Sequence, residues 1–249
     1  MSRNSFMSML VQRFGAVVLI IGKLLRFGFF LGFIYFLLKG SNTLAGYDLN
    51  QTIFFFLTFN LVEIISQFLF REVYRFRPLV VSGSFDLVLS KPISALFRSL
   101  MGGADILDLL SIPFLLVGLF YIGRLLNPTV MQVTFFSLLI LNGLLIAAAF
   151  HIAVLALGII TMEIDHTIMI YRDLTNLGRF PVDIYREPLR GIITFLVPVG
   201  IMITLPAKAI MGLVNPLGVL GSFVFGIISI IASVKLWNHA LTKYSSASS

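Results

Sequence analysis

Apolar residues gather in long runs along this chain, and short polar segments separate the runs. A helix needs about 20 predominantly apolar residues to cross the hydrocarbon core of a bilayer. In lipid, only helices and closed barrels satisfy every backbone hydrogen bond. Five runs reach that length: Gly22 to Leu38, Thr52 to Phe70, Ile106 to Ile122, Val130 to Ile160 and Leu217 to Trp237. The pattern therefore predicts an all-α, polytopic membrane protein.

A sixth apolar run, Gly191 to Leu205, is short, is interrupted by Pro198 and ends at Pro206. Proline interrupts the hydrogen-bond ladder of a helix, and broken spans are common in transporters. We expect a broken or re-entrant element here and count it as the fifth of six transmembrane helices. Because the chain is 58% hydrophobic and 12% charged, with spans along its whole length, we expect one transmembrane domain over residues 1–249.

The positive residues predict an orientation. Lys and Arg are retained on the cytoplasmic side of short loops. With the N-terminus inside, only Lys39, Arg124 and Lys208 of the 18 Lys and Arg residues fall outside. Both termini are therefore expected in the cytoplasm. The net charge of +7 is explained by this topology better than by nucleic-acid binding, since the chain has no basic run.

The first span contains two positive residues that hydropathy alone would bury. Lys23 and Arg26 lie inside an apolar run that begins at Gly15, and burying both at the bilayer centre would be costly. We expect residues 1–21, from Ser5 onward, to form an interfacial helix, after which the chain turns inward while Lys23 and Arg26 reach the head groups. The alternative is one long tilted helix.

Two long cytoplasmic loops are expected, at residues 71–105 and 162–190. In the first, Ser82-Gly83-Ser84 provides a turn and an N-cap for a short helix over Phe85 to Leu89. Lys91-Pro92 ends that helix before a second one at Ile93 to Leu100. Such surface helices could receive force from a soluble motor, or the loop could be an ordinary surface hairpin.

Two sequence blocks resemble the ABC-2 type permeases. Gly83 to Ser94 (GSFDLVLSKPIS) is similar to the glycine, acidic, leucine and basic-proline signature that follows the second helix of that family. Gly178 to Tyr185 (GRFPVDIY), continuing through Pro198 and Leu205-Pro206 to Met211-Gly212, is similar to the stretch leading through its fifth helix. The resemblance covers nearly the whole chain and points to the small bacterial members without a fused ATPase.

This resemblance implies a function for the first loop. In the family, the loop forms a coupling helix that docks into a groove of a nucleotide-binding subunit. That role falls here on six residues: Gly83, Phe85, Asp86, Leu89, Lys91 and Pro92. The resemblance also implies an amphipathic N-terminal helix, a re-entrant hairpin between the last two helices, and assembly as a pair of identical or related permease subunits.

The chemistry of ATP hydrolysis is missing from this sequence. No G-x-x-x-x-G-K-[ST] phosphate loop occurs, so ATP and Mg²⁺ are expected on a partner ATPase, with no cofactor in this chain. The three histidines are scattered, no catalytic motif is present, and the absence of cysteine excludes thiolate chemistry. We therefore expect no metal site and no catalytic residues.

Several polar residues are expected within the membrane or close to it. Glu63, Asn142 and His151 are candidates for a transport pathway, with helix-to-helix pairing or packing as the alternative. Asp105 and Asp108 are expected at the cytoplasmic head-group level, paired with Arg98 or the second loop. The block Arg179, Phe180 and Pro181 is a candidate contact with a partner subunit.

Together with these patterns, the resemblance implies the membrane-spanning subunit of an ATP-binding cassette exporter in the bacterial inner membrane, moving a hydrophobic or amphipathic substrate. Two alternatives come from other classes. A secondary transporter would need ionisable coupling residues deep in its helices and usually internal repeats. An intramembrane lipid-modifying enzyme would need a recognisable catalytic site.

Overall fold

The chain forms a bundle of long helices. The computed structural model describes residues 13–101, 106–161 and 164–245, and the regular elements in these ranges are all helices. Five of them are long and apolar enough to cross a membrane. They are α2 (Arg13–Ser41), α3 (Leu49–Phe70), α7 (Ile106–Leu125), α8 (Val130–Thr161) and α12 (Pro216–Lys243). This confirms the predicted all-α, polytopic membrane fold.

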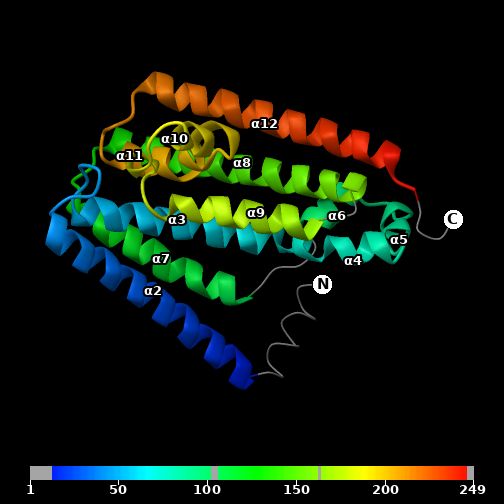
Figure 1. Cartoon of the computed structure of the whole chain (residues 1–249), viewed down its shortest axis with the longest axis horizontal. Coiled ribbons are helices and arrows are strands. Elements are labelled where there is room, and N and C mark those ends of the chain that lie inside the picture. Colours follow the sequence, from blue (N-terminus) through cyan, green and yellow to red (C-terminus); the bar gives the residue numbers. More distant parts are fainter. Residues whose placement is uncertain (1–12, 102–105, 162–163, 246–249) are drawn as a thin grey trace.

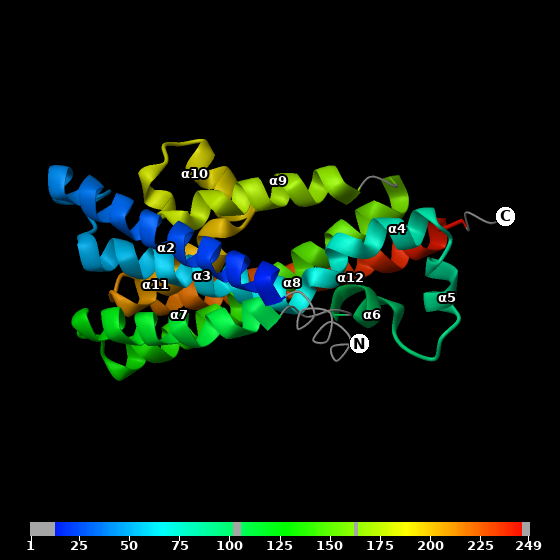
Figure 2. The same ribbon diagram turned by 90° about the horizontal axis from the view of Figure 1, so that it is seen from below.

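The bundle has two ends, which can be followed in Figure 1. The Tyr47 end holds the connections from α2 to α3, from α7 to α8, and from α11 (Leu205–Ile210) to α12. The opposite end, here the α5 end, holds the short helices that follow α3 and the last turns of α12, and Figure 2 shows both ends from another side. In the predicted orientation, the α5 end is cytoplasmic.

Local sequence signals set the helix starts at the Tyr47 end. The Asp48 carboxylate accepts a hydrogen bond from the Gln51 backbone N–H, and the Gln51 side chain accepts one from the Asp48 N–H, each at 2.9 Å. This capping box satisfies two of the otherwise unpaired donors at the start of α3. Asn215 likewise accepts from the Gly218 N–H at 2.6 Å, with Pro216 at the first helical position of α12.

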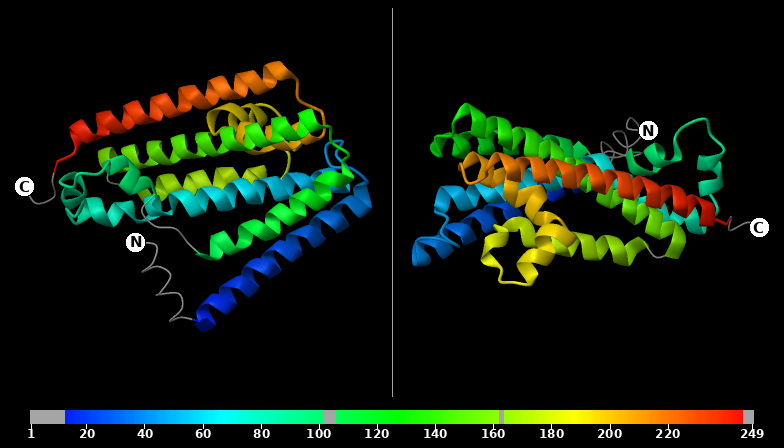
Figure 3. Two further views of the ribbon diagram at one scale, coloured as in Figure 1. Left: turned by 180° about the vertical axis from the view of Figure 1, so that it is seen from behind. Right: turned by 90° about the horizontal axis from the view of Figure 1, so that it is seen from above.

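The core lies along α3 and α8, each more than half buried over its most apolar window. Helices α2, α7 and α12 leave most of their surface exposed, as outer helices facing lipid or another subunit would. Helix α12 packs along α8, and Figure 3 shows the two running side by side. Gly143 on α8 permits a close approach to Met202, because a Cβ at Gly143 would lie 2.7 Å from the Met202 carbonyl oxygen.

Helix α2 differs from the prediction. It runs without a break from Arg13 to Ser41, so the predicted turn near Gly22 is wrong and the alternative of one long helix fits. Lys23 lies on this helix and forms an ion pair with Asp108 of α7 at 2.7 Å. That pair offsets the cost of placing Lys23 in the span, and the Arg26 side chain is exposed. Residues 5–12 of the predicted interfacial helix lie outside the described residues.

The second half of the loop predicted at 162–190 lies at the wrong end for a cytoplasmic loop. Helix α9 (Ile164–Asn176) and η2 (Leu177–Arg179) carry the chain back along the bundle. Asp183 then contacts Tyr47, from the α2–α3 connection, and Lys208 of α11. Since that connection belongs to the opposite end, the chain passes along the bundle at α9, a helix of 13 residues that is not among the helices long and apolar enough to cross a membrane. Arg186 and Arg190 consequently leave the cytoplasmic set, although most Lys and Arg residues remain in it.

The broken element before the last helix is confirmed. Helix α10 (Leu189–Gly191) and η4 (Ile192–Leu196) meet η5 (Gly200–Thr204) and α11 at an angle of 75° around Pro198. Asp183 precedes this element and pairs with Lys208 near its end, at 2.6 Å. Because the two sides of the element meet at one point, it is re-entrant and does not form a complete span.

Candidate functional site

A group of short helices projects beyond the spans at the α5 end. It comprises η1 (Arg71–Arg75), α4 (Phe76–Val81), α5 (Phe85–Leu89) and α6 (Ala95–Met101). The two predicted helices of the 71–105 loop are therefore present. Gly83 adopts a φ of +71°, a conformation that favours glycine and turns the chain between α4 and α5. Ser84 occupies the N-cap position but makes no side-chain capping bond, so the predicted serine cap is wrong.

Phe85 anchors this group to the bundle. Its side chain is fully buried, and its ring lies 5.0 Å from Phe76, 5.2 Å from Tyr244 and 6.3 Å from Trp237, centroid to centroid. Edge-to-face aromatic pairs of this kind stabilise beyond the area they bury. Phe85 therefore ties α5 to α4 and to the end of α12, and its predicted direct contact with an ATPase does not fit its burial.

The outer face of α5 and of the turn after it is apolar and exposed. Leu87 is 66% exposed and Ile93 50%, and Leu89, Lys91 and Pro92 are exposed as well. Leu87 and Ile93 were missing from the predicted coupling residues. The alternation along α5, with Phe85 and Val88 inward, could have identified Leu87 from sequence.

Asp86, predicted as a coupling residue, is half-buried rather than fully on the surface. Burial and the neighbouring Asp86 carboxylate raise the pKa of the Tyr244 hydroxyl. Asp86 therefore lies against the segment that follows α12. A substitution at Asp86 would disturb this contact as well as the surface.

Glu63 and His151 line a common polar pocket between α3, α8 and α9. Its volume is about 20 Å³, room for one water molecule, and Gln67, Tyr171 and Thr175 line it too. Gln67 Nε2 donates to Glu63 Oε1 at 3.0 Å. His151 Nδ1 donates to the Ala147 carbonyl oxygen at 2.8 Å, and the His151 ring packs against Phe70 and Tyr171. His151 thus has the contacts of a hydrogen-bonded packing residue.

Asn142 lies apart from this pocket. Its Nδ2 donates to the Ser222 carbonyl oxygen at 2.8 Å, and its Oδ1 lies against Gly226, where a Cβ would overlap it. Asn142 therefore joins α8 to α12. No group of three or more His, Cys, Asp or Glu residues able to hold a metal occurs among the described residues.

An ion cluster joins three helices beside the pocket. Asp108 is buried and accepts from Lys23 at 2.7 Å and from Arg71 at 3.2 Å. These partners replace the predicted pairing with Arg98, whose guanidinium instead donates to Glu72 at 2.9 Å. Asp105 lies outside the described residues.

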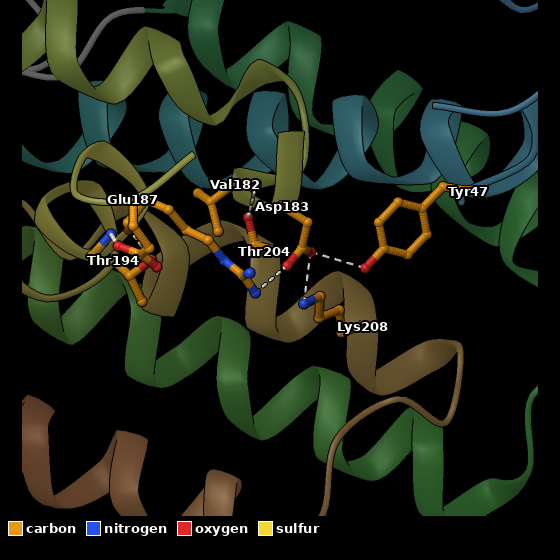
Figure 4. Close-up of polar contacts among 9 residues, drawn as sticks. Tyr47, Val182, Asp183, Glu187, Thr194, Thr204 and Lys208 are labelled. Carbon is orange, nitrogen blue, oxygen red and sulfur yellow. Dashed lines mark hydrogen bonds and ion pairs between the residues drawn. The ribbon is translucent and has the colours of Figure 1, made fainter. Parts of the chain in front are cut away.

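A second polar cluster, centred on Asp183, was not found from sequence. Lys208 and Tyr47 contact the same Asp183 oxygen, at 2.6 and 2.9 Å, and Arg190 Nη2 lies 2.6 Å from the other oxygen. Figure 4 shows the Lys208 and Tyr47 side chains pointing toward Asp183. Burial alone would raise the pKa of Asp183, but the hydrogen bonds from Lys208 and Tyr47, with the charges of Lys208 and Arg190, lower it below its ordinary value. This Asp183 cluster fastens both sides of the re-entrant element to the α2–α3 connection.

The block predicted to contact a partner, Arg179 to Pro181, makes its contacts with other residues of the same chain. The Arg179 guanidinium lies 5.7 Å from the Phe30 ring and 5.8 Å from the Phe59 ring, and it donates to Asn176 at 2.8 Å. Phe180 packs on Phe30 of α2, and Pro181 is buried. These contacts leave little of the block's surface for another subunit.

Comparison with known proteins gives one match. A family model described as "ABC-2 family transporter protein" matches residues 24–248. No curated protein and no solved structure matches the chain. The matched range includes α2 from Leu24 onward, the other long helices, the helices of the α5 end and the re-entrant element. The chain is therefore a multi-pass transport subunit, the permease component of an ABC transporter, and it belongs to the ABC-2 family transporter proteins.

Proposed function

We propose that this permease is the membrane half of an exporter, and that a separate ATPase docks on the exposed face of the α5 end. The observation that carries the proposal is the placement of Leu87 and Ile93, two exposed apolar residues, over the buried anchor Phe85. Apolar groups that remain exposed on a rigid support are typical of protein interaction sites. ATP and Mg²⁺ would be held by the ATPase.

Force applied to this face would reach two helices of the bundle. Helix α3 continues through η1 into α4, and residues 49–81 form one candidate span. Phe85 contacts Phe76 on this extension and Trp237 on α12. A displacement of α5 would therefore move α3 and α12 together, which supports mechanical coupling of ATP hydrolysis to transport.

A complete exporter would contain two permease subunits, identical or related, in the bacterial cytoplasmic membrane with both termini in the cytoplasm. The largely exposed outer helices α2, α7 and α12 provide surface for such pairing. The concentration of Lys and Arg residues between Arg71 and Arg98, and at the end of α12, supports the orientation.

The test is copurification of the ATPase with a surface variant. Leu87→Arg places a charge on the proposed docking face, and we expect it to reduce the ATPase recovered with the tagged permease by about tenfold or more, since an unpaired charge at a desolvated contact is costly. Leu213→Arg is the matched control, because Leu213 is exposed in the connection between α11 and α12 at the other end.

Both variants are expected to keep the thermal stability of the wild type, since exposed substitutions usually change stability by about 0.5 kcal/mol or less. Normal recovery of the ATPase with Leu87→Arg would refute docking on this face. Copurification of no P-loop ATPase with the wild-type chain would refute the two-component exporter itself.

A further inference from the structure

A second pocket opens between η1 and α9, next to the Glu63 pocket. Its volume is about 340 Å³, and it is lined by Gln67, Arg71, Tyr74, Arg75 and Arg172. Three of the five lining residues are arginines and none is acidic. The volume lies in the range of small-molecule sites, roughly 300–1,000 Å³. The arginine pocket, as we name it, is therefore large enough for a negatively charged group.

The positive charge of this pocket is only partly neutralised by the chain. Arg172 makes no hydrogen bond or ion pair with any residue that the structure describes. Arg75 lies 3.9 Å from Glu72 and its side chain is 61% exposed, whereas Arg71 lies 3.2 Å from Asp108, which also pairs with Lys23. Clustered like charges repel one another unless an anion joins them. The guanidinium geometry matches a phosphate or a carboxylate.

The position of the pocket indicates how an anion would be held. Arg71 directly follows α3, at the level where Lys23 and Asp108 pair. In the proposed orientation this is the inner head-group level of the membrane. Deeper along α3, the space narrows to about 20 Å³ beside Glu63, whose carboxyl group offers no attraction to an anion. A head group would therefore stop at the arginines.

The surface beside the arginines is apolar. Met169 lies one turn before Arg172 on α9 and is 61% exposed, and Ile170 is exposed too. Residues three apart on a helix share a face. An acyl or alkyl chain attached to the bound anion would consequently meet apolar side chains.

We propose that Arg172 and Arg75, with Arg71, bind the anionic head group, a phosphate or a carboxylate, of an amphipathic molecule that arrives from the inner leaflet. Its assignment as the cargo of the exporter rests on the proposed function. The binding site itself does not, because it follows from the charges and the volume of the pocket alone.

The binding test uses the purified chain in maltoside micelles and three probes, measured by isothermal titration. The probes are dodecyl phosphate, the zwitterionic dodecylphosphocholine with the same alkyl chain, and inorganic phosphate. We expect dodecyl phosphate to bind at least about tenfold more tightly than either of the others. Arg172→Gln and Arg75→Gln should each weaken that binding by about tenfold, the usual effect of removing a charged hydrogen bond.

Arg186→Gln is the matched control, because Arg186 is exposed near the Asp183 cluster, away from the pocket. It should leave the affinity unchanged, whereas Arg172→Lys should retain part of it. Unchanged affinity in Arg172→Gln, with its thermal stability intact, would overturn the site. If dodecylphosphocholine bound equally tightly, the proposed preference for a net negative charge would be overturned. If inorganic phosphate bound equally tightly, the proposal that the ligand is amphipathic would be overturned.

The cargo assignment is tested separately, with the ATPase present. Dodecyl phosphate should stimulate ATP hydrolysis by the wild-type complex but not by the Arg172→Gln complex. Binding without stimulation would overturn the cargo assignment and leave the site standing. Loss of the ATPase in Leu87→Arg reports on the docking face alone, so the two proposals can fail independently.

Discussion

The two ends of the bundle differ in how far their charged side chains are paired within the chain. At the Tyr47 end, Asp183 accepts from Tyr47, Lys208 and Arg190, each within 2.9 Å. At the α5 end, the arginine pocket has no acidic residue in its lining, and Leu87 and Ile93 face outward. A closed network gains its stability within the chain. An end where Arg172 has no ion-pair partner among the described residues and apolar side chains are exposed has the features of an interaction site.

The largest expected effect tests whether the α5 end is a rigid platform. Phe85→Ala removes the ring that contacts Phe76, Trp237 and Tyr244, and truncating a buried phenylalanine costs about 3–5 kcal/mol. Trp237 is the only tryptophan of the chain, so its fluorescence reports this site directly. We expect a lower melting temperature and a red-shifted Trp237 emission in the variant.

Phe97→Ala is the control for this prediction, because Phe97 lies on α6 and is largely exposed. It should change stability by about 0.5 kcal/mol or less. Equal melting temperatures for Phe85→Ala and the wild type would show that the α5 end is loosely attached, and force could not pass from it to α12.

The next effect concerns the closed end. Asp183→Asn leaves Lys208 without its partner in a partly buried site, and we expect a loss of roughly 2–3 kcal/mol in the free energy of unfolding. Tyr47→Phe removes one hydrogen bond and should cost about 1 kcal/mol. Thermal unfolding in detergent measures both. Asp173→Asn, on the exposed surface of α9, is the matched control and should have little effect.

Acid provides an independent check on Asp183. Because its pKa is lowered in the folded state, its stabilisation is complete above its ordinary pKa and is lost as pH falls through the folded value. The difference in melting temperature between the wild type and Asp183→Asn should be constant down to about pH 5 and shrink below about pH 4. A difference that is already fading near pH 6 would contradict the lowered pKa.

The sequence predicts the spans well because about 20 apolar residues in lipid have few alternatives to a helix. Both helices of the 71–105 loop followed from turn signals at Gly83 and Pro92. The path of residues 162–190 could not be predicted from the sequence. Helix α9 carries Arg172 and Asp173 and so resembles a surface helix rather than a span. Charge counting then assigned Arg186 and Arg190 to the wrong end.

The candidate functional residues show the same difference between local signals and contacts made only in the fold. Leu89, Lys91 and Pro92 could be carried over from the family signature, and they are exposed as a docking surface requires. The Asp183 cluster joins positions 47, 183 and 208, and no local pattern connects residues so far apart in the chain. The arginine pocket could not be predicted for the same reason, since Arg172 meets Arg71 and Arg75 only once α9 packs against η1.

The smallest expected effect compares one arginine from each end. Arg190 lies 2.6 Å from Asp183 with 46% of its side chain exposed, and Arg190→Gln should cost about 0.5–1 kcal/mol, the usual range for such a pair. Arg172 has no ion-pair partner within the described ranges, so Arg172→Gln should leave the melting temperature nearly unchanged, because the lost repulsion from Arg71 and Arg75 offsets the lost attraction to Glu63. Without ligand, Arg190→Gln should therefore melt below Arg172→Gln. Dodecyl phosphate should raise the melting temperature of Arg190→Gln but not that of Arg172→Gln, since a ligand stabilises only the chain that binds it. If Arg172→Gln melted well below Arg190→Gln without ligand, Arg172 would have a structural role, and the distinction between a closed end and a binding end would be lost.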